Sequence, residues 1–248
     1  MSKINIDIDY IKESLYAIGY EINDCIERDN NGTNWQLKFS NSDAIVTIYD
    51  TNKKDNTVVN GKLEEGEKET LKFIIEGLKR KEIEIDPLTP IIINLIKTKT
   101  EGTYYDYKLK MHEETADLLH DILCLSNNTE NREAYIIIGV ADNGTVEGIT
   151  GDIRLDNILD FLKTQEFAGN HIPEIDVKNL YYKYKKIGII ICKSSKNVPF
   201  FLTKKYKGVF DNQIYTRVGN TNTPKTQHAN YVDVEKLWRI HFERENEG

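Results

Sequence analysis

Apolar residues recur at helical spacing in some stretches of the chain and alternate with polar residues in others. Spacing of three and four predicts helices, whereas alternation or a short apolar run predicts strands. Helices are expected over residues 6–22, 64–81, 112–127, 153–165 and 232–244. Strands are expected over residues 35–39, 44–49, 58–61, 101–110, 134–140, 175–184, 187–192 and 214–218. This succession predicts the α+β class.

The clearest break in this pattern lies at Pro87 and Pro90, two prolines within four residues. Proline interrupts both helices and sheets, so the junction between two domains is placed there. A chain of 248 residues is long enough to form two cores. Residues 1–86 are therefore expected to form a small α+β domain, and residues 91–248 a larger domain that carries the chemistry.

Charge, hydropathy and cysteine content argue against several classes of protein. The formal net charge of -7 does not suit a protein that coats nucleic acid by bulk electrostatics. No stretch approaches the roughly 20 apolar residues of a membrane span, and no signal peptide is recognised, so a cytoplasmic protein without membrane contact is expected. The three cysteines lie far apart, which fits neither a disulfide framework nor a zinc site. The five histidines show no paired metal-ligand spacing, so each is expected on the surface or in packing.

Acidic residues at two places suggest a catalytic site. In the strand expected over residues 101–110, Asp106 and Lys108 share one face because successive side chains alternate. Carboxylates that hold Mg²⁺ or Mn²⁺, with a lysine that neutralises developing charge, suit phosphodiester cleavage. Asp142 follows an apolar strand at its exposed tip. Each observation has a simpler explanation, namely a salt bridge on a solvated strand and an Asp that begins an Asn-Gly turn.

A lysine-rich stretch crosses the last expected hairpin. Residues 178–207 contain nine lysines and no carboxylate, with tyrosines between them. The hairpin is expected to turn at Lys185 and Lys186, where these lysines and Lys183 are candidates to follow a phosphate backbone. Lysines also protect exposed strand edges from aggregation, which is an equal alternative. Arg217 is a further candidate for a nucleic-acid contact, because its guanidinium binds two phosphate oxygens at once.

The order of these pieces resembles the Schlafen AlbA-type domain over roughly residues 91–244. The pattern of that domain has a Glu, an acid five residues later in an acid-Phe-Lys strand, a helix, and a Gly-Val-x-Asp-x-Gly hairpin. Residues 101–108 and 135–149 carry the resemblance here. The chain departs from the pattern at Asp106, where Glu is more usual, and in lacking the glycines that follow the helix. Residues 1–86 are weakly similar to TATA-box-binding-protein-like modules.

The resemblance implies a metal-dependent endoribonuclease that cuts structured RNA such as tRNA, of the kind associated with toxin or antiphage functions. It assigns Glu101, Asp106 and Asp142 as catalytic acids and ligands of Mg²⁺ or Mn²⁺. Lys108, which shares the strand face of Asp106, is the further candidate catalytic residue. RNA is the implied partner. A homodimer or an inhibitor complex through residues 1–86 is compatible with this function.

The alternative is a regulator that binds nucleic acid without cutting it, since many proteins with this domain are described only as DNA-binding. Both functions use the lysine-rich stretch. They differ at the acids, because uncompensated carboxylates beside a phosphate weaken binding and are useful only if they take part in catalysis.

Overall fold

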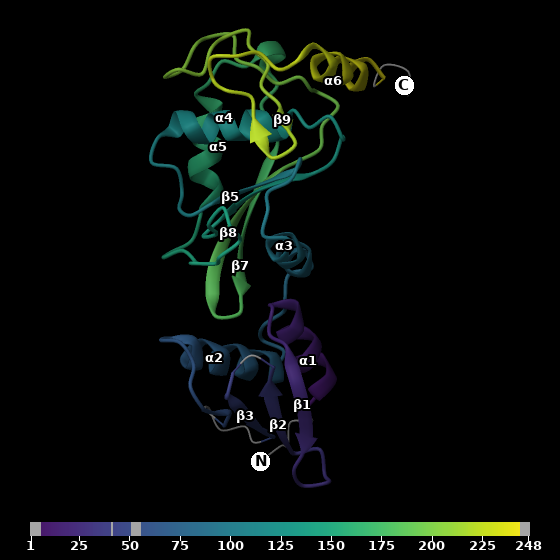
Figure 1. Ribbon diagram of the computed structural model, residues 1–248, viewed down its shortest axis with the longest axis vertical. Coiled ribbons are helices and arrows are strands. Elements are labelled where there is room, and N and C mark those ends of the chain that lie inside the picture. The colour runs from purple at the N-terminus through teal and green to yellow at the C-terminus, as the bar shows by residue number, and fades with distance from the viewer. Residues whose placement is uncertain (1–5, 41, 51–55, 244–248) are drawn as a thin grey trace. The chain divides into compact units, whose positions relative to one another are not determined.

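The computed structural model of the chain describes residues 6–40, 42–50 and 56–243. The chain divides into two compact units. The first comprises Met1–Asn94 and Tyr181–Lys185, and the second comprises Leu95–Leu180 and Lys186–Gly248. Helices and sheets occur together in the chain, so the α+β class expected from the sequence is confirmed (Figure 1). Within the described ranges, no helix is long and apolar enough to cross a membrane.

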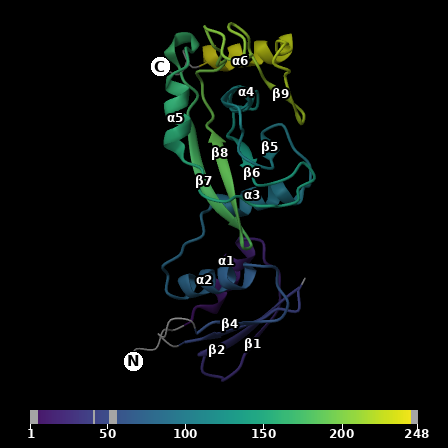
Figure 2. The same ribbon diagram turned by 90° about the vertical axis from the view of Figure 1, so that its left-hand side faces the viewer.

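The first unit contains a four-stranded antiparallel sheet in which the strands lie in chain order. Its elements are α1 (Ile8–Ala17), β1 (Ile22–Glu27), β2 (Asn34–Phe39), β3 (Ile45–Tyr49), β4 (Val58–Asn60) and α2 (Glu67–Lys79). Alternate residues of the strands, such as Leu37, Val46 and Ile48, are buried. They pack with apolar residues of α1 and α2, and both helices lie on the same side of the sheet (Figure 2). The likeness to TATA-box-binding-protein-like modules stays a prediction.

The second unit is built on a mixed sheet with the strand order β5-β6-β8-β7. β5 and β6 are parallel, whereas β6 and β8 are antiparallel. A separate pair, β9 and β10, forms a short antiparallel ribbon. The elements are β5 (Tyr105–Lys108), α4 (Thr115–Ser126), β6 (Ala134–Ile138), α5 (Leu155–Lys163), β7 (Ile175–Tyr182), β8 (Lys185–Cys192), β9 (Arg217–Val218), β10 (Thr221–Asn222) and α6 (Tyr231–Glu243).

The two parallel strands fix the place of the candidate site residues. α4 connects β5 to β6, so both strands run in the same direction and their carboxyl ends lie at one edge of the sheet. Every residue of β6 is buried, which suits a central strand covered on both faces. The residues that follow β5 and β6 therefore emerge side by side from a rigid core.

Two strands are shorter than the alternation predicted. The strand expected over residues 101–110 is limited to β5, and Glu101 lies before it, separated from it by a turn at residues 103–104. The strand expected over residues 214–218 is limited to the two residues of β9. In both places polar side chains make long-range contacts that a strand pattern does not encode, as described below.

The place of one turn and the effect of Pro90 also need correction, whereas the domain junction itself stays a prediction. β7 and β8 are joined by Lys183 and Tyr184, so the turn precedes the expected Lys185 and Lys186. Lys183 adopts a φ of 53° there. A lysine does not predict such a turn, because positive φ angles favour glycine and asparagine. Pro90 does not interrupt a helix, because it lies in the first turn of α3 (Leu88–Lys97), where a missing N–H group is not needed.

Candidate active site

Strand β5 places two charged side chains on one face. Asp106 lies opposite Ile136 of β6, and Lys108 lies opposite Ile138. The Nζ atom of Lys108 is 2.7 Å from Oδ2 of Asp106, as the alternation of strand side chains requires. Asp106 is only 2 % exposed. A carboxylate buried to this degree is stable only when it is paired, so Lys108 compensates its charge.

Glu101 lies before β5 and its side chain returns to that strand. Its Oε1 atom accepts a hydrogen bond of 3.1 Å from the backbone N–H of Tyr107. Burial, together with a hydrogen bond to Asp106 and the charge of that residue, raises the pKa of the Glu101 carboxyl. The neighbouring Asp106 carboxyl therefore favours the protonated form of Glu101.

Arg217 of β9 joins the two acids. Its Nη2 atom is 2.8 Å from Glu101 Oε2 and 3.3 Å from Asp106 Oδ1. Its Nε atom donates to the carbonyl of Gly102 at 2.7 Å, and Nη1 donates to Asn222 Oδ1 at 2.8 Å. The side chain is 2 % exposed. Every nitrogen of this guanidinium therefore has a protein partner, and Arg217 acts here as the internal counter-ion of the acid pair.

Asp121 of α4 is a further acid at this site, buried like Asp106, and sequence analysis did not identify it. Its Oδ2 atom is 3.3 Å from Lys108 Nζ and 2.7 Å from His112 Nε2. Its Oδ1 atom accepts a hydrogen bond of 2.8 Å from Asn222 Nδ2. Asp121 thus holds Lys108 directly, and it holds Arg217 through the amide of Asn222. His112, expected only on the surface or in packing, is a partner of this acid.

A local signal for Asp121 was present in the sequence. Leu118, Ile122 and Leu125 define the inward face of α4, and Asp121 has the spacing that places it on the same face. An acid on the buried side of a helix is unusual unless it is paired. The identity of its partners, however, depends on segments that are distant in the chain.

The pairings change the acid-base properties of the site. Burial alone disfavours the ionised form of Asp121, but the hydrogen bond with His112 and the charge of Lys108 outweigh it and lower the pKa of Asp121. Burial opposes the charge of Lys108 as well, and Asp121 and Asp106 overcome this effect and raise the pKa of its ammonium group. Both groups are therefore charged at neutral pH.

We expect Asp121→Asn to lower the free energy of unfolding at pH 7 by about 1 to 3 kcal/mol, because Lys108 and His112 lose a buried charged partner. The pKa of Asp121 is lowered in the folded state, so its contribution is complete above its unfolded value and is lost as the pH falls below about 4. Urea unfolding at several pH values measures this. Asp160→Asn, which removes an exposed partner of Lys163, is the control and should change little. Equal losses in both variants would contradict the role of Asp121.

Glu101, Asp106, Lys108 and Arg217 line a pocket of about 500 Å³. We call it the acidic pocket. Five residues singled out from the sequence border it, and Asp142 is exposed there. Its lining consists of Lys99, Thr100, Glu101, Asp106, Lys108, Asp142, Arg217, Asn220, Thr221 and Asn222. Whether these residues act in catalysis stays a prediction, but the fold gathers them.

The three lysines proposed to bind nucleic acid do not line the acidic pocket. Lys183 is in the turn between β7 and β8, and Lys185 begins β8. Lys186 forms an ion pair of 2.7 Å with Asp152. Their contact with RNA stays a prediction. Arg217 lines the pocket, but its partners already occupy its nitrogen atoms.

The acids are not arranged as a ready metal site. Over residues 6–40, 42–50 and 56–243, no three His, Cys, Asp or Glu side chains are placed to hold a metal ion together. Carboxylate oxygens suit Mg²⁺ and Mn²⁺, but Glu101 and Asp106 face the cations Arg217 and Lys108 instead. The donor chemistry fits a hard divalent ion, and the present geometry does not.

Comparison with known proteins gives one match. The sequence pattern of the family described as Schlafen, AlbA_2 matches residues 101–226, which include every residue of the acidic pocket except Lys99 and Thr100. No curated protein and no solved structure matches the chain. Membership of this family supports a nucleic-acid-related function. Because the match covers half of the sequence and contains the acid pair with its counter-ion, the chain belongs to the Schlafen AlbA_2 family.

Proposed function

We propose that the chain is an endoribonuclease that cuts structured RNA such as tRNA in the acidic pocket. One observation supports this most: a carboxyl with a raised pKa, Glu101, borders the same pocket as the ammonium group of Lys108. The Lys108 side chain is 30 % exposed, so it remains accessible to a phosphate. A proton donor and a cation beside one cavity are the groups that phosphodiester cleavage needs.

Each side chain then has a distinct role. Lys108 neutralises charge on the phosphate oxygens as the reaction proceeds. Glu101, in its protonated form, gives its proton to the oxygen that leaves when the P–O bond breaks. Arg217 and Asp106 hold Glu101 in place. Asp142, exposed at the pocket, is the candidate to accept the proton of the attacking oxygen.

A requirement for Mg²⁺ or Mn²⁺ is proposed from the resemblance. Because Arg217 and Lys108 already neutralise the acids, an ion has to displace their contacts, and we expect it to bind weakly. Purified protein is incubated with total tRNA, with EDTA, and with EDTA followed by excess Mn²⁺. EDTA should slow cleavage at least tenfold, and Mn²⁺ should restore it. Full activity in EDTA would show that the side chains suffice and would remove the metal from the proposal. Intact tRNA under every condition would contradict the nuclease itself.

The second candidate function is binding of nucleic acid without cleavage. It is favoured by the pairing of the acids, since Glu101, Asp106 and Asp121 each already have a cationic partner and therefore repel a phosphate less. A binder retains tRNA in a filter assay and leaves it intact. A cleaving enzyme converts it to fragments, and the same experiment therefore separates the two functions. A role as a toxin or antiphage effector in the cytoplasm, and a partner for residues 1–86, are proposed on the resemblance alone.

A further inference from the structure

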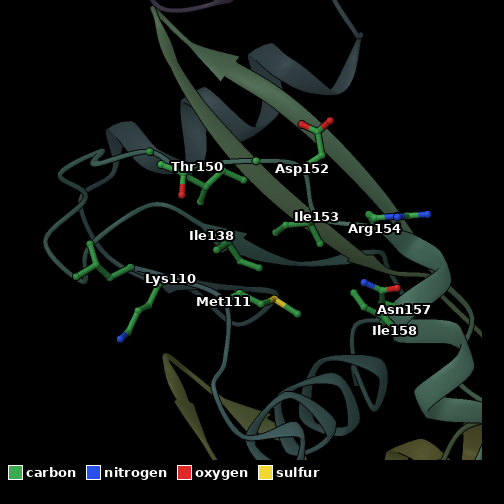
Figure 3. A pocket seen from close by; sticks show the side chains of 13 residues that line it. Lys110, Met111, Ile138, Thr150, Asp152, Ile153, Arg154, Asn157 and Ile158 are labelled. Atoms are coloured by element: carbon green, nitrogen blue, oxygen red, sulfur yellow. The ribbon is translucent and has the colours of Figure 1, made fainter. Parts of the chain in front are cut away.

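A second pocket of about 480 Å³ lies in the same unit as the acidic pocket. Figure 3 shows Met111, Ile138 and Ile153 in the middle of it, with Lys110 on one side and Arg154 and Asn157 on the other. The floor is apolar and the edge is polar. The apolar residues are Leu109, Met111, Ile138, Ile149, Ile153 and Ile158. We call this cavity the isoleucine pocket.

The isoleucine pocket begins where the acidic pocket ends along the chain. Lys108 lines the acidic pocket, and the next residues, Leu109 to Met111, line the isoleucine pocket. Two residues span at most about 7 Å, so Lys108 and Lys110 are separated by a distance on the scale of one nucleotide. At the end of β6, Ile138 lines the isoleucine pocket, and Asp142, four residues later, lines the acidic pocket. An RNA strand with a phosphate in the acidic pocket would therefore reach the isoleucine pocket with an adjacent nucleotide.

The charges at the edge leave one free cation among the described residues. Asp152 is paired with Lys186, and Lys110 is paired with Glu113. For Arg154 no ion pair is found within residues 56–243. In the same range the side chains of Thr150 and Asn157 have no hydrogen bond to the protein. The edge thus offers a guanidinium, an amide and a hydroxyl to a ligand.

We propose that the isoleucine pocket holds one unpaired nucleoside unit of the RNA strand whose neighbouring phosphate lies in the acidic pocket. The base rests on the apolar floor, because a base face is apolar and every base has one. The Asn157 amide and the Thr150 hydroxyl contact its polar edge, and Arg154 contacts the adjoining phosphate. Sequence-selective recognition of RNA commonly uses bases that are unstacked in this way. This inference rests on the proposed function and names its substrate as RNA with an unpaired base beside the cleaved bond.

The variant Asn157→Trp tests the proposal by filling the pocket. Asn157 is exposed on α5, so a larger side chain does not disturb the core. Asp156→Trp, at the preceding exposed position that does not line the pocket, is the matched control. The probes are the four nucleoside 5′-monophosphates, whose binding to the full chain is measured by NMR titration. Asn157→Trp should weaken binding of the best monophosphate at least tenfold, and Asp156→Trp should leave it within a factor of about two, since additional area in a surface position changes little.

The outcomes for the pocket and for the nuclease are separable. Binding that is lost only in Asn157→Trp supports the pocket even if tRNA is never cut. No binding of any monophosphate by the wild type at millimolar concentration, or equal loss in both tryptophan variants, overturns it. If tRNA is cut, Asn157→Trp should also raise KM more than it lowers kcat, because a neighbouring subsite mainly supplies binding. Unchanged KM with efficient cleavage overturns the pocket and leaves the nuclease standing.

Discussion

Replacing Arg217 with methionine should lower the free energy of unfolding at pH 7 by roughly 3 to 5 kcal/mol, the range for removal of one partner from a buried ion pair. The loss arises because Glu101 and Asp106 keep their buried carboxyl groups without the shared cation. Methionine retains much of the side-chain volume, so the effect reports charge and hydrogen bonding rather than a large cavity. Urea unfolding followed by circular dichroism measures the change.

The pH dependence of this loss has a defined sign. Without Arg217, the pKa of the Glu101 carboxyl, which is already raised in the folded protein, rises further because the stabilising cation is gone. The folded variant then regains stability by taking up protons as the pH falls. The difference between the variant and the wild type should therefore narrow toward pH 4. A gap that widens toward acid pH would show that the loss has another cause.

Arg239→Met is the matched control for Arg217→Met. Arg239 pairs with Glu235 on the surface, where the two side chains are 71 % and 41 % exposed. Such pairs contribute about 1 kcal/mol or less. If Arg217→Met destabilises the fold no more than this control, Arg217 is not the counter-ion of the acid pair. Mn²⁺ should also raise the unfolding temperature of Arg217→Met more than that of the wild type, because freed carboxylates bind the ion better and binding stabilises the folded state.

Glu101→Gln should reduce single-turnover cleavage of RNA by a factor of about 100 or more, the usual size of a lost general acid or base. Glutamine keeps the shape of the side chain, and its single amide oxygen can still accept a hydrogen bond from either the Tyr107 N–H or Arg217. It cannot transfer a proton. Binding of RNA should stay within a few-fold of the wild type or become tighter, since one negative charge near the phosphate is removed.

Glu147→Gln is the control for this experiment, because Glu147 is exposed in the Asp142 hairpin and does not line the acidic pocket. Its rate of cleavage should equal that of the wild type. If the Glu101→Gln variant cuts RNA at more than a tenth of the wild-type rate, Glu101 is not the general acid. Parallel loss of cleavage and binding, with the fold intact, would instead assign it to RNA binding.

The parts of the site that depend on local rules were predictable. Alternation along a strand places Asp106 and Lys108 on the same face, and the ion pair between them follows from that rule. The apolar run before Asp142 predicts a buried strand with an acid beyond its end, and β6 has this arrangement. The order of these segments was sufficient to predict the family.

The partners of the acids were not predictable, because they come from distant segments. From the sequence, Arg217 is a candidate to bind a phosphate. Only the fold shows that its guanidinium is buried against Glu101. Asp121, on the helix α4, is a partner of Lys108 in β5 and of Asn222 in β10. Hydrophobic periodicity reports which face of an element is buried, and it does not report which element packs there.

The distance in sequence between Glu101 and Arg217 also sets an order of events during synthesis. The hydrogen bond between them joins positions 116 residues apart. A growing chain that has emerged only as far as Asp142 already carries all three proposed catalytic acids, but it lacks the guanidinium that lets two of them stay buried together. The acid pair can therefore reach its final arrangement only after β9 has left the ribosome. A chain released early in translation therefore carries the acids without an assembled site.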